Sequence, residues 1–152
     1  MRKSSLAKPG AAQVLLVADS SDGLKARKSV LEEQGFSIAT ASNGEEAIEV
    51  LSKGKFDLLV TDYKMPTMSG IELIRRARPQ HPTLSVILLA GFAEALALDE
   101  KSTGADVVIA KGSHEIPNLL RSATRLLARK TPRRPPASQK ETSPKKPRSK
   151  SG

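Results

Sequence analysis

Short apolar runs alternate with longer segments of helical periodicity along the middle of this chain. The apolar runs are mostly continuous rather than alternating, which is typical of strands that are covered on both faces of a sheet. Helix-length segments separate them, so the runs do not form hairpins. The predicted strands are 14–17, 36–40, 58–60, 86–89 and 107–110.

A segment with the spacing of an amphipathic helix follows each predicted strand. The last segment is the clearest, because its apolar residues between Ile116 and Leu127 fall on one helical face. Glycine and proline residues stand near the boundaries between elements. The predicted helices are 21–34, 44–53, 69–78, 93–102 and 114–128.

Five strand–helix units in succession predict an α/β fold with a parallel sheet, right-handed crossovers and helices on both faces. In such a sheet the functional site lies at the carboxyl ends of the strands. Those ends bring two carboxylates and one ammonium group together from three separate strands. The residues just past the strands are Asp19, Asp62, Ala90, Gly91 and Lys111.

This set of side chains predicts a phosphoryl-transfer site. Two carboxylates at strand ends, Asp19 and Asp62, can bind Mg²⁺, which prefers oxygen ligands and keeps several waters. One carboxylate can attack phosphorus when a metal ion and a cation neutralise the phosphoryl oxygens. Lys111 can supply that cation.

The net charge of +9 is concentrated at the two ends of the chain. Residues 129–152 contain nine Lys or Arg residues against one acidic residue, and the central part is mildly acidic. The Pro-, Lys- and Ser-rich end has no large apolar residue to order it. We expect a basic flexible N-terminus (1–12), one folded domain (13–129) and a disordered basic tail (130–152).

Other features narrow the class of protein. The chain has no cysteine, and no apolar stretch reaches the roughly 20 residues that a membrane span needs. We therefore expect a soluble cytoplasmic protein that does not bind membranes. The first strand is followed by neither a G-x-G-x-x-G motif nor a P-loop, which disfavours a dinucleotide- or nucleotide-binding domain.

The segment from Asp62 to Gly70, DYKMPTMSG, resembles the D-x-x-M-P-x-M-S-G signature of response-regulator receiver domains. Three further segments resemble the same CheY-like family: VLLVADS at the first strand, ASNGEEAIEVL at the second helix and GADVVIAKG at the fifth strand. The resemblance covers about residues 12–128. It implies a flavodoxin-like (βα)5 fold whose five parallel strands have the order 2-1-3-4-5.

The resemblance also implies the roles of individual residues. Asp62 is implied as the phosphoacceptor, with Asp19 and the backbone carbonyl of Lys64 as further Mg²⁺ ligands. Lys111 is implied as the cation that contacts the phosphoryl group, and the backbone of Ala90 and Gly91 is a further candidate contact. A sensor histidine kinase or a phosphotransfer protein is implied as the donor.

Four positions depart from the family pattern. Ala18 replaces the first of two adjacent acids, and Ala90 replaces the Ser or Thr whose hydroxyl contacts the phosphoryl group. Val108 stands where the family has an aromatic residue, and Gly112 where it has proline. We expect a trans Lys111–Gly112 bond, because a cis bond before a non-proline residue costs about 2.5–4 kcal/mol.

The sequence therefore favours a stand-alone receiver in a two-component phosphorelay, with no enzymatic turnover of its own, acting on a downstream protein. A receiver that binds partners independently of phosphorylation is one alternative, because the switch positions are apolar. A nucleic-acid-associated protein is another, since the basic tail could bind phosphates weakly and with strong salt dependence.

Overall fold

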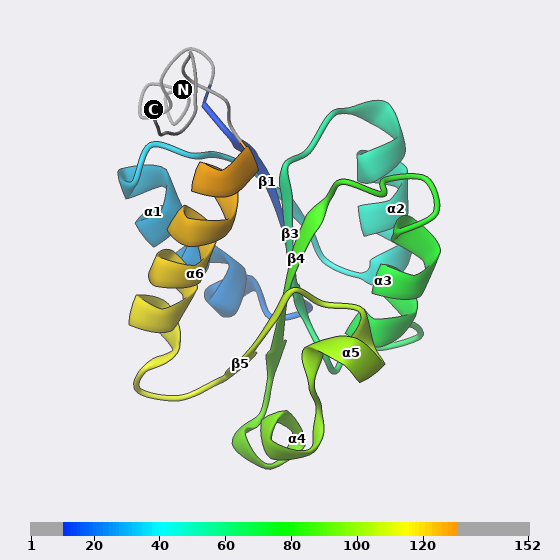
Figure 1. Ribbon diagram of the computed structural model, residues 1–152, viewed down its shortest axis with the longest axis vertical. Coiled ribbons are helices and arrows are strands. Elements are labelled where there is room, and N and C mark those ends of the chain that lie inside the picture. The colour runs from blue at the N-terminus through cyan, green and yellow to red at the C-terminus, as the bar shows by residue number, and fades with distance from the viewer. Residues whose placement is uncertain (1–10, 131–152) are drawn as a thin grey trace, which may run out of the picture.

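The computed structural model describes residues 11–130, which form a sheet of five parallel strands with helices on both faces (Figure 1). The strands lie in the order β2-β1-β3-β4-β5, which confirms the predicted flavodoxin-like α/β architecture. The predicted flexible N-terminus and basic tail fall almost wholly outside the described residues. The strands are β1 (Gln13–Val17), β2 (Ser37–Ala41), β3 (Leu58–Asp62), β4 (Ser85–Ala90) and β5 (Val107–Ala110).

Helices cover both faces of the sheet, as the edge-on view in Figure 1 shows. The helices are α1 (Ser21–Glu33), α2 (Gly44–Lys53), α3 (Gly70–Ala77), α4 (Phe92–Ala97), α5 (Glu100–Thr103) and α6 (Glu115–Lys130). Helices α1 and α6 pack together on one face, and α2, α3 and α5 lie on the opposite face. The short helix α4 lies beyond the end of β4.

The strands are buried on both faces, because successive side chains point to opposite sides of the sheet. Val14 and Leu16 of β1 belong to the apolar cluster under α1 and α6, whereas Leu15 and Val17 belong to the cluster under α2 and α3. The continuous apolar runs in the sequence follow from this double coverage.

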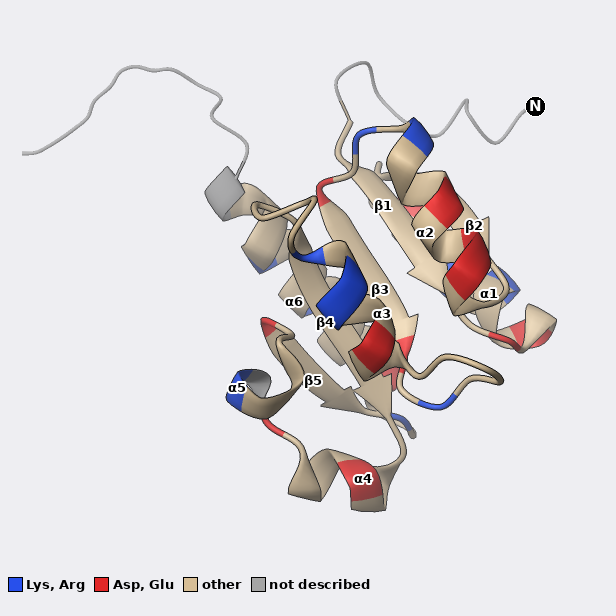
Figure 2. Ribbon diagram, turned by 90° about the vertical axis from the view of Figure 1, so that its right-hand side faces the viewer, with Lys and Arg blue, Asp and Glu red and all other residues tan. Residues whose placement is uncertain are grey.

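Helices α1, α2 and α3 begin at side-chain caps. Ser20, Asn43 and Ser69 precede α1, α2 and α3, and the side chain of each accepts a hydrogen bond from a backbone N–H three residues further on. Figure 2 shows basic and acidic residues side by side on α3, whose outer face is solvent-exposed. Among the described residues no helix is long and apolar enough to cross a membrane.

The five predicted strands are confirmed, but the single helix predicted over 93–102 is wrong. The chain forms α4 and α5 instead, with an extended backbone at Leu98 (φ −104°, ψ 145°) between them. Leu98 packs against the core on the α2 and α3 side. Asp99 then caps a new turn, since its Oδ1 accepts a hydrogen bond from the backbone N–H of Ser102 at 2.7 Å.

Candidate functional site

Asp62 is the last residue of β3 and lies at the carboxyl edge of the sheet, in register with Leu89 of β4. All five residues of β3 are buried, and Asp62 is only 2% exposed. A carboxylate at this depth needs cations or hydrogen bonds close to it, because burial alone disfavours its charged form.

The predicted partners of Asp62 come from the ends of β1 and β5. Lys111 follows β5 and places its Nζ 3.1 Å from Oδ1 of Asp62. The Lys111–Gly112 bond is trans, and Gly112 has a positive φ of 145°. Asp19, in the loop after β1, is exposed and close enough to Asp62 for the two carboxylates to repel each other. The parallel sheet thus brings the three predicted side chains to one edge.

The charge on Asp62 is under opposing influences. Burial raises the pKa of the Asp62 carboxyl above its ordinary value, and repulsion by Asp19 acts in the same direction. Arg27 and Lys111 oppose this rise, but burial is the largest cause and the pKa stays raised. Oδ1 of Asp62 forms ion pairs with Lys111 and Arg27 but accepts no hydrogen bond of normal geometry within the described part of the chain.

Sequence reasoning missed Arg27, a second cation beside Asp62. Its guanidinium Nη1 lies 3.4 Å from Oδ1 of Asp62, and its Nε donates a 2.6 Å hydrogen bond to Oε2 of Glu115 at the start of α6. Arg27 is 7% exposed, so this is a buried cation held between two carboxylates.

The sequence did contain a signal for Arg27. It lies three residues after Leu24 and four before Leu31, and both of these leucines pack in the core under α1 and α6. Arg27 therefore occupies a position in the apolar stripe of the helix, where a charged residue is rarely buried without a partner. The identity of that partner was not readable from the sequence.

The loop after β3 carries Lys64, whose side chain is 78% exposed. Its Nζ forms a 3.1 Å ion pair with Oε2 of Glu94 on α4, and this contact lowers the pKa of Glu94. The loop ends at Gly70, whose N–H donates to the carbonyl of Tyr63 at 2.8 Å. A Cβ at Gly70 would collide with the backbone carbonyl of Asp62, so this position requires glycine.

A cleft of about 450 Å³ opens between the loops that follow β1 and β3. It is lined by Asp19, Tyr63, Lys64, Met65, Pro66 and Ser69. The described residues contain no group of three Asp, Glu, His or Cys side chains that could hold a metal ion. The two carboxylates of Asp19 and Asp62 nevertheless fit Mg²⁺, which accepts a small number of carboxylates, a backbone carbonyl and waters.

Three of the positions that depart from the family pattern, Ala18, Ala90 and Val108, carry apolar side chains. Ala18 and Ala90 are buried at the ends of β1 and β4, with 0% and 1% exposure. Val108 is partly buried and packs against the core on the α2 and α3 side. None of these three side chains can donate a hydrogen bond to a ligand on Asp62.

Comparison with known proteins agrees with this geometry. The model of the response regulator receiver domain family matches residues 14–123, which lie inside the predicted domain. The response regulator receiver protein CpdR of Brucella abortus is 40% identical over 90 residues, which are 59% of this chain and 74% of that protein. Two other curated relatives are much longer, and the matched part of this chain spans 9% and 36% of their lengths.

Solved structures show the same fold. The response regulator TrrA of Thermotoga maritima, in complex with Mg²⁺ and BeF, has 31% identity and a TM-score of 0.69, covering 76% of this chain and 98% of that one. A structure of the histidine kinase ThkA with TrrA matches with 32% identity, a TM-score of 0.68 and the same coverage. The chain therefore belongs to the response regulator receiver domain family and is a CheY-like receiver domain of two-component signalling.

Proposed function

We propose that this receiver accepts a phosphoryl group on Asp62 from a histidine kinase or a phosphotransfer protein. The observation that carries the proposal is the state of Asp62: a buried carboxylate whose Oδ1 has no hydrogen bond within the described residues and lies 3.1 Å from the ammonium group of Lys111. The complex of a similar receiver with its histidine kinase supports this class of donor.

The proposed step is a displacement at phosphorus. A carboxylate oxygen of Asp62 attacks the phosphorus of a phosphohistidine, forming an acyl phosphate while the bond from phosphorus to the imidazole nitrogen breaks. The imidazole leaves and takes up a proton from solvent. Lys111 stabilises the negative charge on the phosphoryl oxygens, because its ammonium group already faces the attacking carboxylate.

Mg²⁺ is the proposed cofactor. Asp19, Asp62 and the backbone carbonyl of Lys64 would hold it at the cleft, where Asp19 and Lys64 are both lining residues. When bound, the ion neutralises charge on the phosphoryl oxygens. The similar receiver that was solved with Mg²⁺ and BeF supports this assignment.

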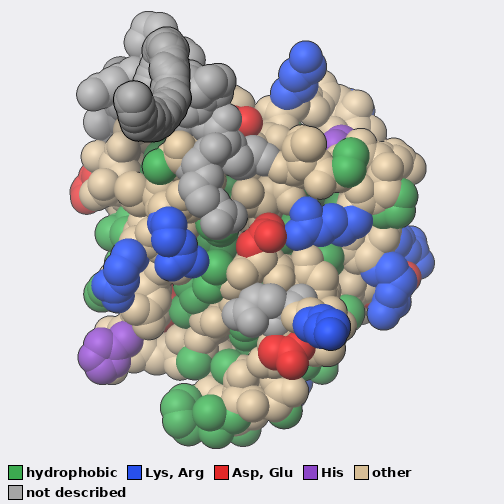
Figure 3. All heavy atoms as spheres, viewed as in Figure 1, with side chains coloured by type: hydrophobic (Ala, Val, Ile, Leu, Met, Phe, Trp, Pro, Cys, Tyr) green, Lys and Arg blue, Asp and Glu red, His purple; other side chains and the backbone are tan. Residues whose placement is uncertain are grey.

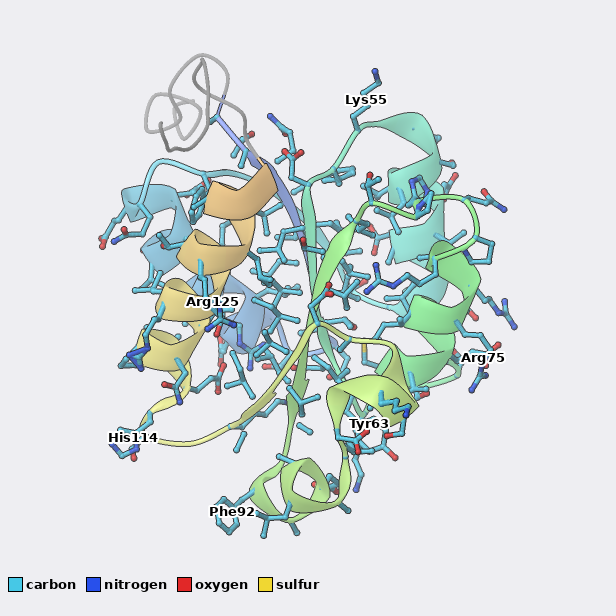
Figure 4. All side chains as sticks on the ribbon, in the orientation of Figure 1. Lys55, Tyr63, Arg75, Phe92, His114 and Arg125 are labelled. Carbon is cyan, nitrogen blue, oxygen red and sulfur yellow. The ribbon has the colours of Figure 1, made fainter. Side chains whose placement is uncertain are left out.

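The proposed output is the binding of a downstream protein in the cytoplasm, by a receiver without enzymatic turnover of its own. Helix α4 carries two large apolar side chains that are exposed, Phe92 at 68% and Leu96 at 74%. Figure 3 shows hydrophobic side chains gathered at this end of the molecule, and in Figure 4 Phe92 points away from the sheet. Exposed apolar surface of this kind supports a protein partner.

Thermal unfolding with Mg²⁺ and beryllofluoride, a mimic of the phosphoryl group, tests the proposal. Ligand binding to the native state raises the melting temperature by mass action. At a ligand concentration of a hundred times Kd, the free energy of unfolding rises by about 2.7 kcal/mol. We expect a clear rise in the wild-type protein. We expect no rise on adding the same ligands to Asp62→Asn, which removes the ionised oxygen but keeps the shape of the side chain.

The absence of a rise in the wild-type protein would contradict the proposal. It would favour the alternative of a binding module that acts independently of phosphorylation, and the apolar residues at Ala18, Ala90 and Val108 would then reflect loss of the switch.

A further inference from the structure

Arg27 is a buried cation at a position where its helix otherwise presents apolar residues to the core. It and Leu31 are the buried residues of α1. Its guanidinium reaches the carboxyl edge of the sheet, where Nη1 lies 3.4 Å from Oδ1 of Asp62. A guanidinium taken out of water is costly unless charged partners compensate it, so its presence here calls for an explanation.

The hydrogen bonding of Arg27 is incomplete. Arginine has five N–H donors in a fixed planar fork, and in the described part of the chain only Nε of Arg27 donates a hydrogen bond, to Glu115. Nη1 lies 3.4 Å from Oδ1 of Asp62, which accepts no hydrogen bond from the described residues. Nη1 of Arg27 and Oδ1 of Asp62 thus lie together at one site as an ion pair without a hydrogen bond between them.

A phosphoryl group on Asp62 would offer acceptors to the Nη donors of Arg27. Phosphoryl oxygens match the planar fork of a guanidinium, and charge-assisted hydrogen bonds of this kind are about twice as strong as neutral ones. Lys111 provides a single ammonium group at the same oxygen, without this fork geometry. The donors left free on Arg27 are therefore available to a tetrahedral group at Asp62.

We propose that Arg27 is a second fixed cation of the phosphoacceptor site and donates hydrogen bonds to the phosphoryl group on Asp62. Glu115 is the positioning residue, since its 2.6 Å hydrogen bond to Nε orients the guanidinium. This inference rests on the proposed function of Asp62 as a phosphoacceptor. It assigns to α1 a phosphoryl contact that the apolar side chain of Ala90 does not provide.

The proposal predicts opposite effects of Arg27 on two ligands. A guanidinium near Asp62 attracts the phosphoryl group, but it repels a divalent cation bound to the same carboxylate. A merely structural role predicts effects of the same sign, because loosening the site weakens the binding of both ligands. Measuring the two affinities separately distinguishes the roles.

The test uses the full chain with Arg27→Leu, which keeps an apolar side chain on the buried face of α1, and Arg27→Lys, which keeps the charge but loses the fork. Arg125→Leu is the matched control, because Arg125 is an exposed arginine on α6 (Figure 4). Tyr63 is the single tyrosine of a chain without tryptophan and lines the cleft, so its fluorescence reports on ligand binding there. Circular dichroism checks that each variant is folded.

We expect Arg27→Leu to bind beryllofluoride about ten- to a hundredfold more weakly than the wild-type protein at saturating Mg²⁺, as for the loss of a charged hydrogen bond. Its affinity for Mg²⁺ alone should rise by about three- to tenfold. Arg27→Lys should bind beryllofluoride with intermediate affinity, and Arg125→Leu should match the wild type for both ligands.

Glu115→Gln tests the positioning role. Glutamine keeps an oxygen that can accept the hydrogen bond from Nε but lacks the charge, so the variant should lose less beryllofluoride affinity than Arg27→Leu. Glu115→Leu, which removes the acceptor as well, should approach the loss seen in Arg27→Leu. Unchanged binding in Glu115→Leu would overturn the positioning role.

Two results would overturn the role of Arg27. If the affinity of Arg27→Leu for beryllofluoride equals or exceeds that of the wild-type protein, the guanidinium either blocks Asp62 or does not contact the ligand. A parallel fall in affinity for Mg²⁺ and beryllofluoride would show a structural role. Failure of the proposed function looks different, since the wild-type protein and every variant would then bind no beryllofluoride while Mg²⁺ still changes the fluorescence of Tyr63.

Discussion

At the scale of single residues, the chemistry of this receiver centres on the buried carboxylate of Asp62. Its pKa is raised mainly by burial, although Arg27 and Lys111 both oppose the rise. The folded protein therefore binds a proton on Asp62 more tightly than the unfolded chain does. Keeping the carboxylate ionised costs folding free energy that a neutral residue of the same shape would not cost.

Asp62→Asn should accordingly raise the free energy of unfolding at pH 7.5 in buffer without Mg²⁺. The sign follows from linkage: above the folded-state pKa the wild-type protein bears the whole cost of the buried charge. The advantage of the variant should shrink as the pH falls through that pKa, and it should vanish below the unfolded value of about 3.9. Urea unfolding curves of both proteins across this pH range measure the difference.

Asp22→Asn is the control for this series, because Asp22 is exposed in the first turn of α1. It should show no comparable gain at pH 7.5. A loss of stability in Asp62→Asn at that pH would contradict the prediction, and it would mean that attraction by Arg27 and Lys111 outweighs burial.

At the scale of elements, the geometry of the site depends on how closely α3 begins to the end of β3. Gly70, the first residue of α3, packs against the backbone carbonyl of Asp62, and a Cβ there would also lie 2.8 Å from Cδ1 of Leu88. Both neighbours belong to the sheet, and one of them is backbone, so neither can move without disturbing the core.

Gly70→Ala should therefore lower the free energy of unfolding by about 1–3 kcal/mol, the usual range for overpacking. It should also weaken the response to Mg²⁺ and beryllofluoride, because the new methyl group displaces the backbone of Asp62. Gly54→Ala is the matched control, since its Cβ would meet only the side chain of Phe56, at 3.3 Å. A Gly70→Ala protein as stable as Gly54→Ala would contradict the close contact.

At the scale of the whole molecule, the net positive charge and the buried apolar residues are concentrated in different parts of the sequence. The buried apolar residues of both core clusters lie between Val14 and Leu127. Residues 131–152 contain no Val, Leu, Ile, Met or aromatic residue and hold seven of the Lys and Arg residues. This division lets the receiver and its basic end be tested separately.

Deletion of residues 131–152 should change the free energy of unfolding by no more than about 0.5 kcal/mol, because the deleted segment has no large apolar side chain to contribute to the core. The response to beryllofluoride should also be unchanged. Urea unfolding and the thermal shift of the truncated chain measure both quantities. A large loss of stability would contradict the predicted domain boundary.

The same deletion tests association with nucleic acid. If the basic end binds phosphates, the full chain should bind DNA at low salt with an affinity that falls steeply as salt rises, and the truncated chain should not bind. Binding that survives the deletion would place the contact on the receiver domain instead.

Much of the architecture could be predicted from the sequence, since it follows from local patterns. Continuous apolar runs indicated strands buried on both faces, and the ends of parallel strands converge on one edge of the sheet. For this reason the sequence alone was enough to group Asp19, Asp62 and Lys111 at that edge. Where the local pattern was short, at residues 93–102, the prediction of one helix was wrong.

The sequence by itself thus determined the order in which strands and helices follow one another along the chain. It also determined which three charged groups lie at the carboxyl edge, because apolar periodicity and strand ends are properties of local segments. Only the tertiary structure decided which charges meet. The contact between Arg27 and Glu115 joins residues 88 positions apart, on two helices that meet only when both pack on the same face of the sheet. Such pairings depend on distances between folded elements, which no local pattern encodes.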